Sequence, residues 1–135
     1  MSSNENKMPA ILYADNEEQN LVSFKAIFRR DFKIFSTTSP AEALSILEKE
    51  QVGIIICSKF IGQMKGVDFL ASTITQHGNR IRLLVSDYAY QDTKMKAAIF
   101  GYLIKPWDED QIKRVLDDAF HYFISKKASD NIGSI

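Results

Sequence analysis

The sequence is poor in several features that would assign it to a specialised class of protein. It has a single cysteine, Cys57, so it cannot form an intramolecular disulfide. No apolar run approaches the roughly 20 residues that a bilayer-spanning helix needs. A glycine-rich phosphate loop, paired metal-binding cysteines and a nucleophile elbow are also missing from the sequence. These absences exclude a disulfide-stapled fold, a membrane-spanning helix and several common catalytic motifs.

The sequence also lacks an excess of charge of either sign. Lysine plus arginine and aspartate plus glutamate each number 17, which removes the general electrostatic argument for nucleic acid or membrane as a partner. One buried thiol is tolerated in a reducing cytosol, and the polar residues 1–9 have no apolar centre typical of a secretion signal. We therefore expect a cytoplasmic protein without direct nucleic-acid or membrane contacts.

What the sequence does contain is regular alternation. Short apolar runs alternate with helical periodicity five times, the pattern of a parallel sheet covered by helices on both faces. The expected strands cover residues 10–14, 32–35, 54–57, 81–85 and 102–104. We predict an α/β fold with a doubly wound, five-stranded parallel sheet of flavodoxin-like type in residues 9–125. Residues 1–8 are expected to be a disordered tail, and residues 126–135 a tail or linker.

The helices between these strands are predicted from apolar side chains at helical spacing. Ser39 is expected to cap the second helix, followed by Pro40, with Glu42 completing a capping box. A short helix is expected over residues 91–100, and the last helix should begin at Asp108. The side chains expected to face the core are Leu21, Phe24, Phe28, Leu44, Leu47, Val67, Leu70, Ala71, Ile74, Ile112, Val115, Leu116, Ala119, Phe120 and Phe123.

Polar residues follow the expected strands at their carboxyl ends, where doubly wound sheets place their sites. They are Asp15 with Asn16, residues 58–66, residues 86–87 and residues 105–106. Because the carboxyl ends of parallel strands share one edge, these scattered residues should converge in space. Several folds with small-molecule sites would satisfy this pattern.

Four motifs carry a resemblance to a known family. They are ILYADNE at residues 11–17, MKGVDFL at 64–70, LVS at 84–86 and YLIKPWD at 102–108. In this order and at this spacing, they resemble the receiver domain of two-component response regulators over about residues 9–125. The resemblance implies a receiver fold with strand order 2-1-3-4-5, a role in phosphorelay signal transduction and no enzymatic activity of its own.

The resemblance also implies a particular chemistry at the carboxyl edge. In a working receiver, a carboxylate on the third strand accepts the phosphoryl group, and acidic residues after the first strand help to hold Mg²⁺. A lysine and a hydroxyl contact the phosphoryl oxygens, positions matched here by Lys105 and Ser86. The aromatic switch position of the fifth strand falls on Tyr102.

This sequence departs from the family pattern at the acceptor. Ser58 falls where the acceptor aspartate is expected, and its hydroxyl is not ionised near pH 7. Asn16 replaces the second acidic residue, and Gly62 replaces a common proline. Asp15 and Lys105 remain and are expected to pair directly. We predict weak or absent Mg²⁺ binding, because hard cations rely on anionic oxygen ligands.

Two positions near this edge keep alternative interpretations. Ser86 and Tyr102 retain the switch residues, but Tyr102 could simply pack beside the last helix with its hydroxyl in water. Asp87 either replaces some of the lost negative charge, narrows access to the pocket, or merely begins the loop. The segment between Ser86 and Lys105 is short for the family, which indicates a fourth helix reduced by about a turn.

The leading hypothesis is a pseudo-receiver that acts through protein–protein contacts without aspartyl phosphorylation. A signalling kinase, an output domain or a second copy of the chain are its expected partners. The first alternative is a phosphorylatable receiver with a non-standard acceptor such as Ser58 or Asp87. The second, from another class, is a flavodoxin-like binder of a small ligand.

Overall fold

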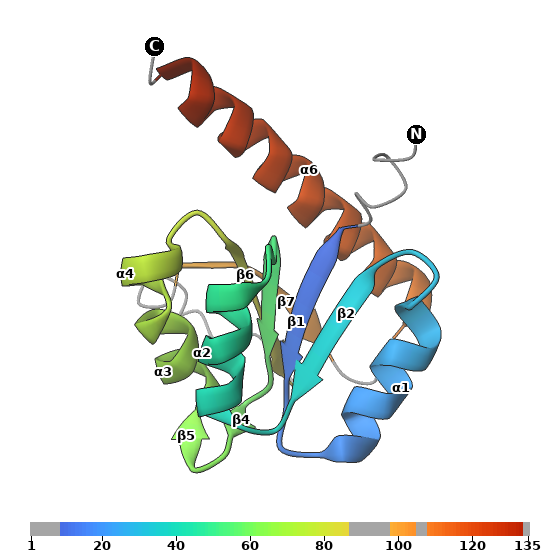
Figure 1. The fold of residues 1–135 in the computed structure, drawn as a ribbon. Coiled ribbons are helices and arrows are strands. Elements are labelled where there is room, and N and C mark those ends of the chain that lie inside the picture. Colours follow the sequence, from blue (N-terminus) through green and yellow to red (C-terminus); the bar gives the residue numbers. More distant parts are fainter. Residues whose placement is uncertain (1–8, 87–97, 105–107, 134–135) are drawn as a thin grey trace.

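The computed structural model describes residues 9–86, 98–104 and 108–133, and its centre is a parallel sheet (Figure 1). The sheet has five strands in the order β2-β1-β3-β6-β7, all pairing in parallel. The strands are β1 (Ala10–Ala14), β2 (Lys33–Thr37), β3 (Ile54–Cys57), β6 (Ile81–Ser86) and β7 (Ile99–Ile104). Since β6 and β7 are the fourth and fifth strands of this sheet along the chain, the predicted order 2-1-3-4-5 is confirmed.

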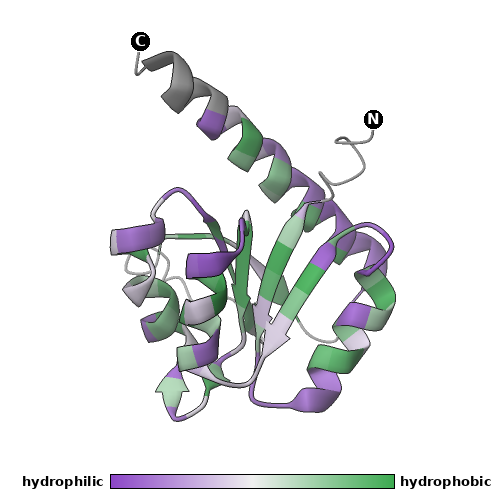
Figure 2. Cartoon of the chain, in the orientation of Figure 1, coloured by the Kyte–Doolittle hydropathy of each residue, from purple (hydrophilic) through white to green (hydrophobic). Residues whose placement is uncertain are grey.

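Helices cover both faces of the sheet, as a doubly wound fold requires (Figure 1). The helices are α1 (Glu18–Phe28), α2 (Pro40–Lys49), α3 (Gly66–Ser72), α4 (Ile74–His77) and α6 (Glu109–Gly133). One core cluster joins α1 and α6 to one face, and a second joins α2 and α3 to the other. In Figure 2 the strands are mainly hydrophobic, whereas many helix ends and turns are hydrophilic.

The core beneath α1 is aromatic. Leu21, Phe24 and Phe28 are buried as predicted. Phe24 lies between the rings of Tyr13 and Phe28, with ring centroids 4.7 and 4.8 Å away. Further along, Phe32 stacks on Phe120 of α6 at 5.5 Å. Offset and tilted aromatic pairs of this kind add packing energy beyond the area they bury, and they join α1 to α6.

The start of α2 is only partly as predicted. Ser39 Oγ accepts a hydrogen bond from Glu42 N at 3.2 Å, which confirms Ser39 as the cap. The Glu42 carboxylate does not complete the capping box, because it accepts from the Thr37 hydroxyl, and Ser39 N donates to Thr37 Oγ1. Leu44 was expected in the core but is 38% exposed, since the turn of the helix places Ala43 and Leu47 inward instead.

The single helix expected after β3 is divided in two at Thr73. The Thr73 hydroxyl donates to Leu70 O at 2.7 Å, and Thr73 N also donates to Leu70 O. A short antiparallel hairpin, β4 (Phe60–Ile61) with β5 (Met64–Lys65), precedes α3 and was not predicted. This hairpin builds part of the carboxyl edge of the sheet.

The last strand begins earlier than predicted. Residues 91–97 of the expected fourth helix lie outside the described residues, so its shortening stays a prediction. Its expected end is wrong, because Ile99 and Phe100 belong to β7. Arg82 pairs with Ile99 while Leu83 pairs with Gly101, which places a bulge at Phe100. β-branched and aromatic side chains favour a strand here, and pairing with β6 stabilises it.

The last helix is longer than predicted. Residues 126–133, expected to belong to a tail or linker, continue α6 as far as Gly133. No glycine or proline interrupts residues 109–132, so no helix breaker stops it. Figure 1 shows α6 running past the edge of the sheet. Over the described part of the chain, no helix is both long enough and apolar enough to cross a membrane.

Candidate functional site

The carboxyl edge of the sheet brings together several of the predicted site residues. Asp15 and Asn16 follow β1, and Ser58 follows β3, the strand that pairs with β1. Ser58 N donates to the carbonyl oxygen of Ala14 at 2.9 Å, and Ala14 is the residue that precedes Asp15 in the chain. Ser86 ends β6, the next strand along the sheet. Asp87 and Lys105 lie outside the described residues, so the predicted Asp15–Lys105 pair stays a prediction.

Asp15 is a buried carboxylate that is held by neighbouring donors. It is 2% exposed. Its Oδ2 accepts from the Tyr13 hydroxyl at 2.7 Å and from Asn20 Nδ2 at 3.0 Å. Its Oδ1 accepts from Glu17 N at 3.0 Å. Tyr13 reaches it because residues two apart on a strand project from the same face. Three donors therefore stabilise the charge of this carboxylate.

Burial fixes the protonation of two neighbours of Asp15. Removal from water, followed by the nearby Asp15 charge, raises the pKa of the Tyr13 phenol far above its ordinary value. Tyr13 therefore remains a hydrogen-bond donor to the carboxylate at physiological pH. The same two causes raise the pKa of the Cys57 thiol. Cys57 is fully buried within the apolar strand β3.

Asn16 ties the end of β1 to the β4–β5 hairpin. Its Nδ2 donates to Gly62 O at 3.0 Å, and its Oδ1 accepts from Gly62 N. Gly62 has a φ of +60°, which glycine adopts without strain. An added Cβ there would lie 3.0 Å from Pro40 Cδ. The sequence interpretation identified Gly62 only as a glycine in place of a common proline, and no sequence signal indicated its contact with Asn16.

Gly66 lets α3 start against the backbone of Ser58. A Cβ on Gly66 would lie 1.8 Å from Ser58 O, a distance that no side chain can tolerate. Gly66 N donates to Lys59 O at 2.7 Å, which closes the loop around the hairpin. Ser58 itself is 8% exposed. The edge is therefore tightly packed around Ser58, the position that the sequence resemblance matches to the acceptor.

Tyr102 lies on the opposite face of the sheet from the last helix, so one of its two sequence interpretations does not hold and the switch role stays a prediction. It is half-buried and packs against the cluster that α2 and α3 cover. The interpretation that Tyr102 packs beside the last helix is therefore wrong. Leu103 is the residue that faces α6, in the cluster with Leu116 and Ala119. Because side chains alternate along a strand, Tyr102 must project the other way.

The described side chains at this edge are poor ligands for a hard cation such as Mg²⁺. Asp15 is the one carboxylate among Asp15, Asn16 and Ser58, and it already accepts three hydrogen bonds. The Asn16 amide oxygen accepts from Gly62. No group of three or more His, Cys, Asp or Glu side chains among the described residues could hold a metal ion. These side chains do not fit the anionic oxygen ligands that Mg²⁺ requires.

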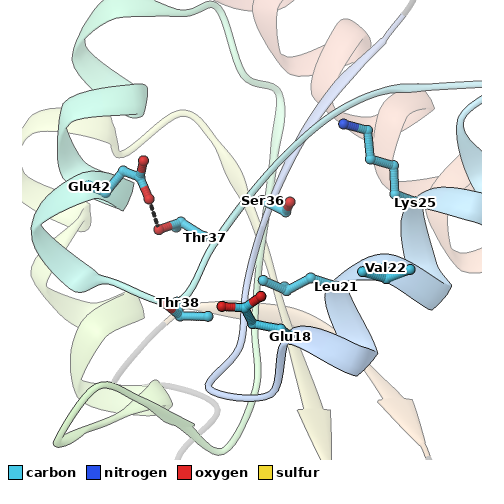
Figure 3. Close-up of a pocket in the computed structure, with 8 residues that line it drawn as sticks. All are labelled: Glu18, Leu21, Val22, Lys25, Ser36, Thr37, Thr38 and Glu42. Carbon is cyan, nitrogen blue, oxygen red and sulfur yellow. Dashed lines mark hydrogen bonds between the residues drawn. The ribbon is translucent and has the colours of Figure 1, made fainter.

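A cleft separate from these residues lies beside the carboxyl end of β2 (Figure 3). Its volume is about 400 Å³, and it lies between α1, β2 and the start of α2. Glu18 and Glu42 line it, together with the hydroxyls of residues 36–38. In Figure 3 the Thr37 hydroxyl is directed at Glu42, while the Lys25 side chain extends away from both carboxylates. This cleft is therefore acidic and contains none of the predicted site residues.

One buried charge at the other end of the sheet was missed by the sequence interpretation. Arg82 of β6 is 2% exposed. Its guanidinium donates to Thr73 Oγ1 at 2.8 Å and to the carbonyl oxygens of Thr73, His77 and Arg80 at 3.1, 2.5 and 2.8 Å. Burial, and then the neighbouring Arg80, lower the pKa of Arg82 to about 10. An arginine inside the apolar run IRLLV was the available signal.

Comparison with known proteins places these features in a family. The family model described as response regulator receiver domain matches residues 11–117. The hydrogenase transcriptional regulatory protein HoxA of Bradyrhizobium diazoefficiens is 25% identical over 127 residues, which are 91% of this chain and 26% of HoxA. The transcriptional regulatory protein GlrR of Escherichia coli is 26% identical over 91 residues, 65% of this chain and 20% of GlrR. The chain thus spans about a quarter or less of these relatives.

Solved structures share the fold. A signal receiver domain of an HD domain-containing protein from Pseudomonas fluorescens has a TM-score of 0.82 at 24% identity, covering 90% of this chain and 93% of that one. A CheY-like receiver domain protein from Methanospirillum hungatei has a TM-score of 0.80 at 17% identity, covering 88% and 98%. With the sheet order and the four motifs, the family match over most of the chain leads to one conclusion. The chain belongs to the response regulator receiver domain family of two-component signalling.

Proposed function

We propose that this chain is a pseudo-receiver, a receiver domain that signals through protein contacts without aspartyl phosphorylation. The observation that carries the proposal is Ser58, which directly follows β3 and hydrogen-bonds to the end of β1 beside Asp15. In the family this position carries the acceptor carboxylate. A serine hydroxyl is not ionised near neutral pH, so it lacks the charge with which a carboxylate attacks phosphorus.

The hydrogen bonds of Asp15 and Asn16 support the proposal. A receiver needs Mg²⁺ to neutralise the charge of the phosphoryl donor and the acceptor. Here Asp15 is held by Tyr13, Asn20 and Glu17, and the amide of Asn16 is engaged with Gly62. Binding a cation would break these hydrogen bonds. The described edge offers one carboxylate where a working receiver has three, so we expect weak or absent Mg²⁺ binding.

The proposed partners are proteins. HoxA and GlrR are named transcriptional regulatory proteins and are several times longer than the part that this chain matches. By analogy, we propose a signalling kinase or an output domain as partner, with a homodimer as a further form. We also propose that the domain is cytoplasmic, has no enzymatic activity of its own and does not contact nucleic acid directly.

The test is phosphorylation by acetyl phosphate with Mg²⁺, followed by intact-mass measurement. The wild-type chain should gain no phosphate under conditions that label an ordinary receiver. Ser58→Asp together with Asn16→Asp should restore Mg²⁺-dependent labelling, because the two changes return two carboxylates to the edge. Ser72→Asp, at the exposed end of α3, is the matched control and should remain unlabelled.

Two outcomes would contradict the proposal. A mass gain of one phosphate in the wild type would favour a receiver with a non-standard acceptor, and loss of that gain in Ser58→Ala would identify the serine. Flavin colour or nucleotide absorbance at stoichiometric amounts, together with no labelling of the restored variant, would instead favour a flavodoxin-like binder. Amide shifts in beryllofluoride with Mg²⁺ give a second readout of the same edge.

A further inference from the structure

A cleft at the amino ends of β6 and β7 lies at the opposite end of the sheet from Asp15 and Ser58. Its volume is about 440 Å³, within the range of small-molecule sites. The start of β6, the start of β7 and the middle of α6 form its walls, which include Arg80, Phe100, Tyr122 and Lys126. None of the residues that match the receiver pocket lines it.

The charge in this cleft has one sign. Arg80, Arg82 and Lys126 line it, and no acidic residue does so within the described part of the chain. The donors of Arg82 are engaged with carbonyl oxygens and Thr73. Arg80 is less fully engaged: among the described residues its Nη1 donates to Asn79 Oδ1, and its Nε is buried without a partner. An unsatisfied buried donor is costly, and an anion would satisfy it.

The neighbouring titratable groups respond to the same concentration of positive charge. Arg80 contributes, after burial, to the lowered pKa of Arg82 and to the lowered pKa of His77. Burial also lowers the pKa of Arg80 itself. A negative ligand in the cleft would relieve this repulsion.

The outer wall of the cleft is aromatic. Phe100 and Tyr122 stack with ring centroids 5.3 Å apart and an interplanar angle of 30°. They are 39% and 49% exposed, although large aromatic side chains on a helix and a strand are usually buried. The bulge at Phe100 is what presents its ring beside α6. Exposed aromatic faces next to cations are the combination that binds flat rings bearing an anionic group.

Two other clefts in the described residues fit such a ligand less well. The cleft of Figure 3 is lined by Glu18 and Glu42, which would repel an anion. The third, near the start of β1, has lysines, but Lys33 and Lys127 already lie over the rings of Phe35 and Phe123. Of these three clefts, the one at Arg80 combines a buried donor with exposed stacked rings.

We propose that this cleft binds a free nucleoside phosphate, with Arg80 and Lys126 contacting the phosphate and Phe100 and Tyr122 contacting the base. The proposal does not depend on the pseudo-receiver proposal, because it uses a different end of the sheet. It requires no covalent step, only binding. A nucleotide bound there would contact both α6 and β7, the elements that meet at the cleft.

Isothermal titration of the full chain with GMP, guanosine and inorganic phosphate tests the proposal. GMP should bind at least about tenfold more tightly than guanosine or phosphate alone, since each of these retains half of the contacts. Arg80→Gln and Lys126→Gln should each weaken GMP binding by about tenfold, the scale of a charge-assisted hydrogen bond. Tyr122→Leu should weaken GMP binding about fivefold or more while leaving phosphate binding unchanged.

Lys25→Gln is the matched control, because Lys25 lines the acidic cleft of Figure 3 and should not affect GMP binding. Lys126 is exposed, so its variant should fold even if Arg80→Gln is destabilised. No GMP binding at millimolar concentration would overturn the proposal. Equal affinity for GMP and phosphate would show that Phe100 and Tyr122 do not contact the base. Unchanged GMP binding in Arg80→Gln and Lys126→Gln would show that the nucleotide binds elsewhere.

Discussion

The two ends of the sheet each bury one charged side chain, and they hold it in different ways. Asp15 at the carboxyl edge and Arg82 at the amino end of β6 are both 2% exposed. Asp15 is stabilised mainly by side chains, the Tyr13 hydroxyl and the Asn20 amide, with one backbone N–H. Arg82 is stabilised mainly by backbone carbonyl oxygens at the ends of α3 and α4.

This difference suggests that Asp15 belongs to a functional site, whereas Arg82 belongs to the scaffold that supports the fold. Carbonyl oxygens near the C-terminus of a helix carry partial negative charge, so a cation that contacts them stabilises the break between α3 and α4. Two of the three donors to Asp15 are side chains that single substitutions can replace. The carboxyl edge can therefore lose or regain chemistry while the fold persists, whereas the contacts of Arg82 are part of the fold. The predictions below test this contrast.

Replacing the scaffold charge should have the largest effect. Arg82→Met keeps most of the buried volume but removes the guanidinium that donates to the carbonyl oxygens of Thr73, His77 and Arg80. We expect the free energy of unfolding to fall by about 3–5 kcal/mol, because several charge-assisted hydrogen bonds are lost at once. Urea denaturation measures it. Arg80→Met is the control, with an expected loss under about 1 kcal/mol. A comparable loss in both variants would remove the special role of Arg82.

Replacing the charge at the carboxyl edge should cost less. Asp15→Asn keeps the size of the side chain, but its amide nitrogen cannot accept, so one donor among Tyr13, Asn20 and Glu17 loses its acceptor. We expect a loss of about 2 kcal/mol in unfolding free energy. The surface variant Asp31→Asn breaks the exposed pair with Lys113 and should cost less than about 0.5 kcal/mol. A gain in stability for Asp15→Asn would mean that burying the charge outweighs its hydrogen bonds.

Removing a single donor should cost about 1–1.5 kcal/mol at neutral pH. Tyr13→Phe deletes the hydroxyl that donates to Asp15. The deficit should shrink above about pH 10, where an unfolded tyrosine loses its proton. The native Tyr13, with its raised pKa, keeps the proton, so the unfolded state binds fewer protons and the wild type loses stability as pH rises.

Chemical denaturation of wild type and Tyr13→Phe at pH 7, 9 and 10.5 measures this change. Cys57, whose pKa is also raised, contributes in the same direction in both proteins and cancels in the difference. Tyr122→Phe is the control, because Tyr122 is 49% exposed and lies at the other end of the sheet from Asp15. A constant difference between wild type and Tyr13→Phe at all three pH values would contradict the predicted linkage.

The sequence predicted the sheet better than the contacts at its ends. Strands β1 and β3 are continuous apolar runs, so their limits and their central position follow from composition alone. The start of β7 did not follow, because Ile99 and Phe100 suit a helix pattern as well as a strand and pairing with β6 decides between them. The face that Tyr102 occupies follows from its pairing with Leu84, whose side chain belongs to the same core cluster.

The candidate site shows the same limit. Strand ends and motif spacing were enough to bring Asp15, Asn16 and Ser58 to one edge. Their partners were not predictable, because Tyr13 satisfies an apolar pattern while its hydroxyl binds Asp15, and Gly62 is separated from Asn16 by 46 positions. Long-range side-chain contacts of this kind depend on the finished fold. Arg82 was missed for the complementary reason, since a charge within an apolar strand contradicts the pattern that identifies the strand.

The smallest effect is expected where the carboxyl edge is most exposed. Asn16→Ala removes both hydrogen bonds to Gly62, and we expect a loss of under about 1 kcal/mol in global stability because water can replace them. The local effect should be larger. Amide hydrogen exchange at Gly62 should accelerate, since its N–H loses its acceptor, whereas exchange in β1 and β3 should not change.

Gln63→Ala, in the same turn, is the matched control and should leave Gly62 protected. Faster exchange spreading into β3 would mean that Asn16 supports the sheet itself, and the edge would then resemble the scaffold end. Exchange confined to the hairpin would mean that Asn16 acts on the loop alone. In that case an aspartate at position 16 would change the chemistry of the edge without cost to the fold, which is the condition that a restored metal site would need.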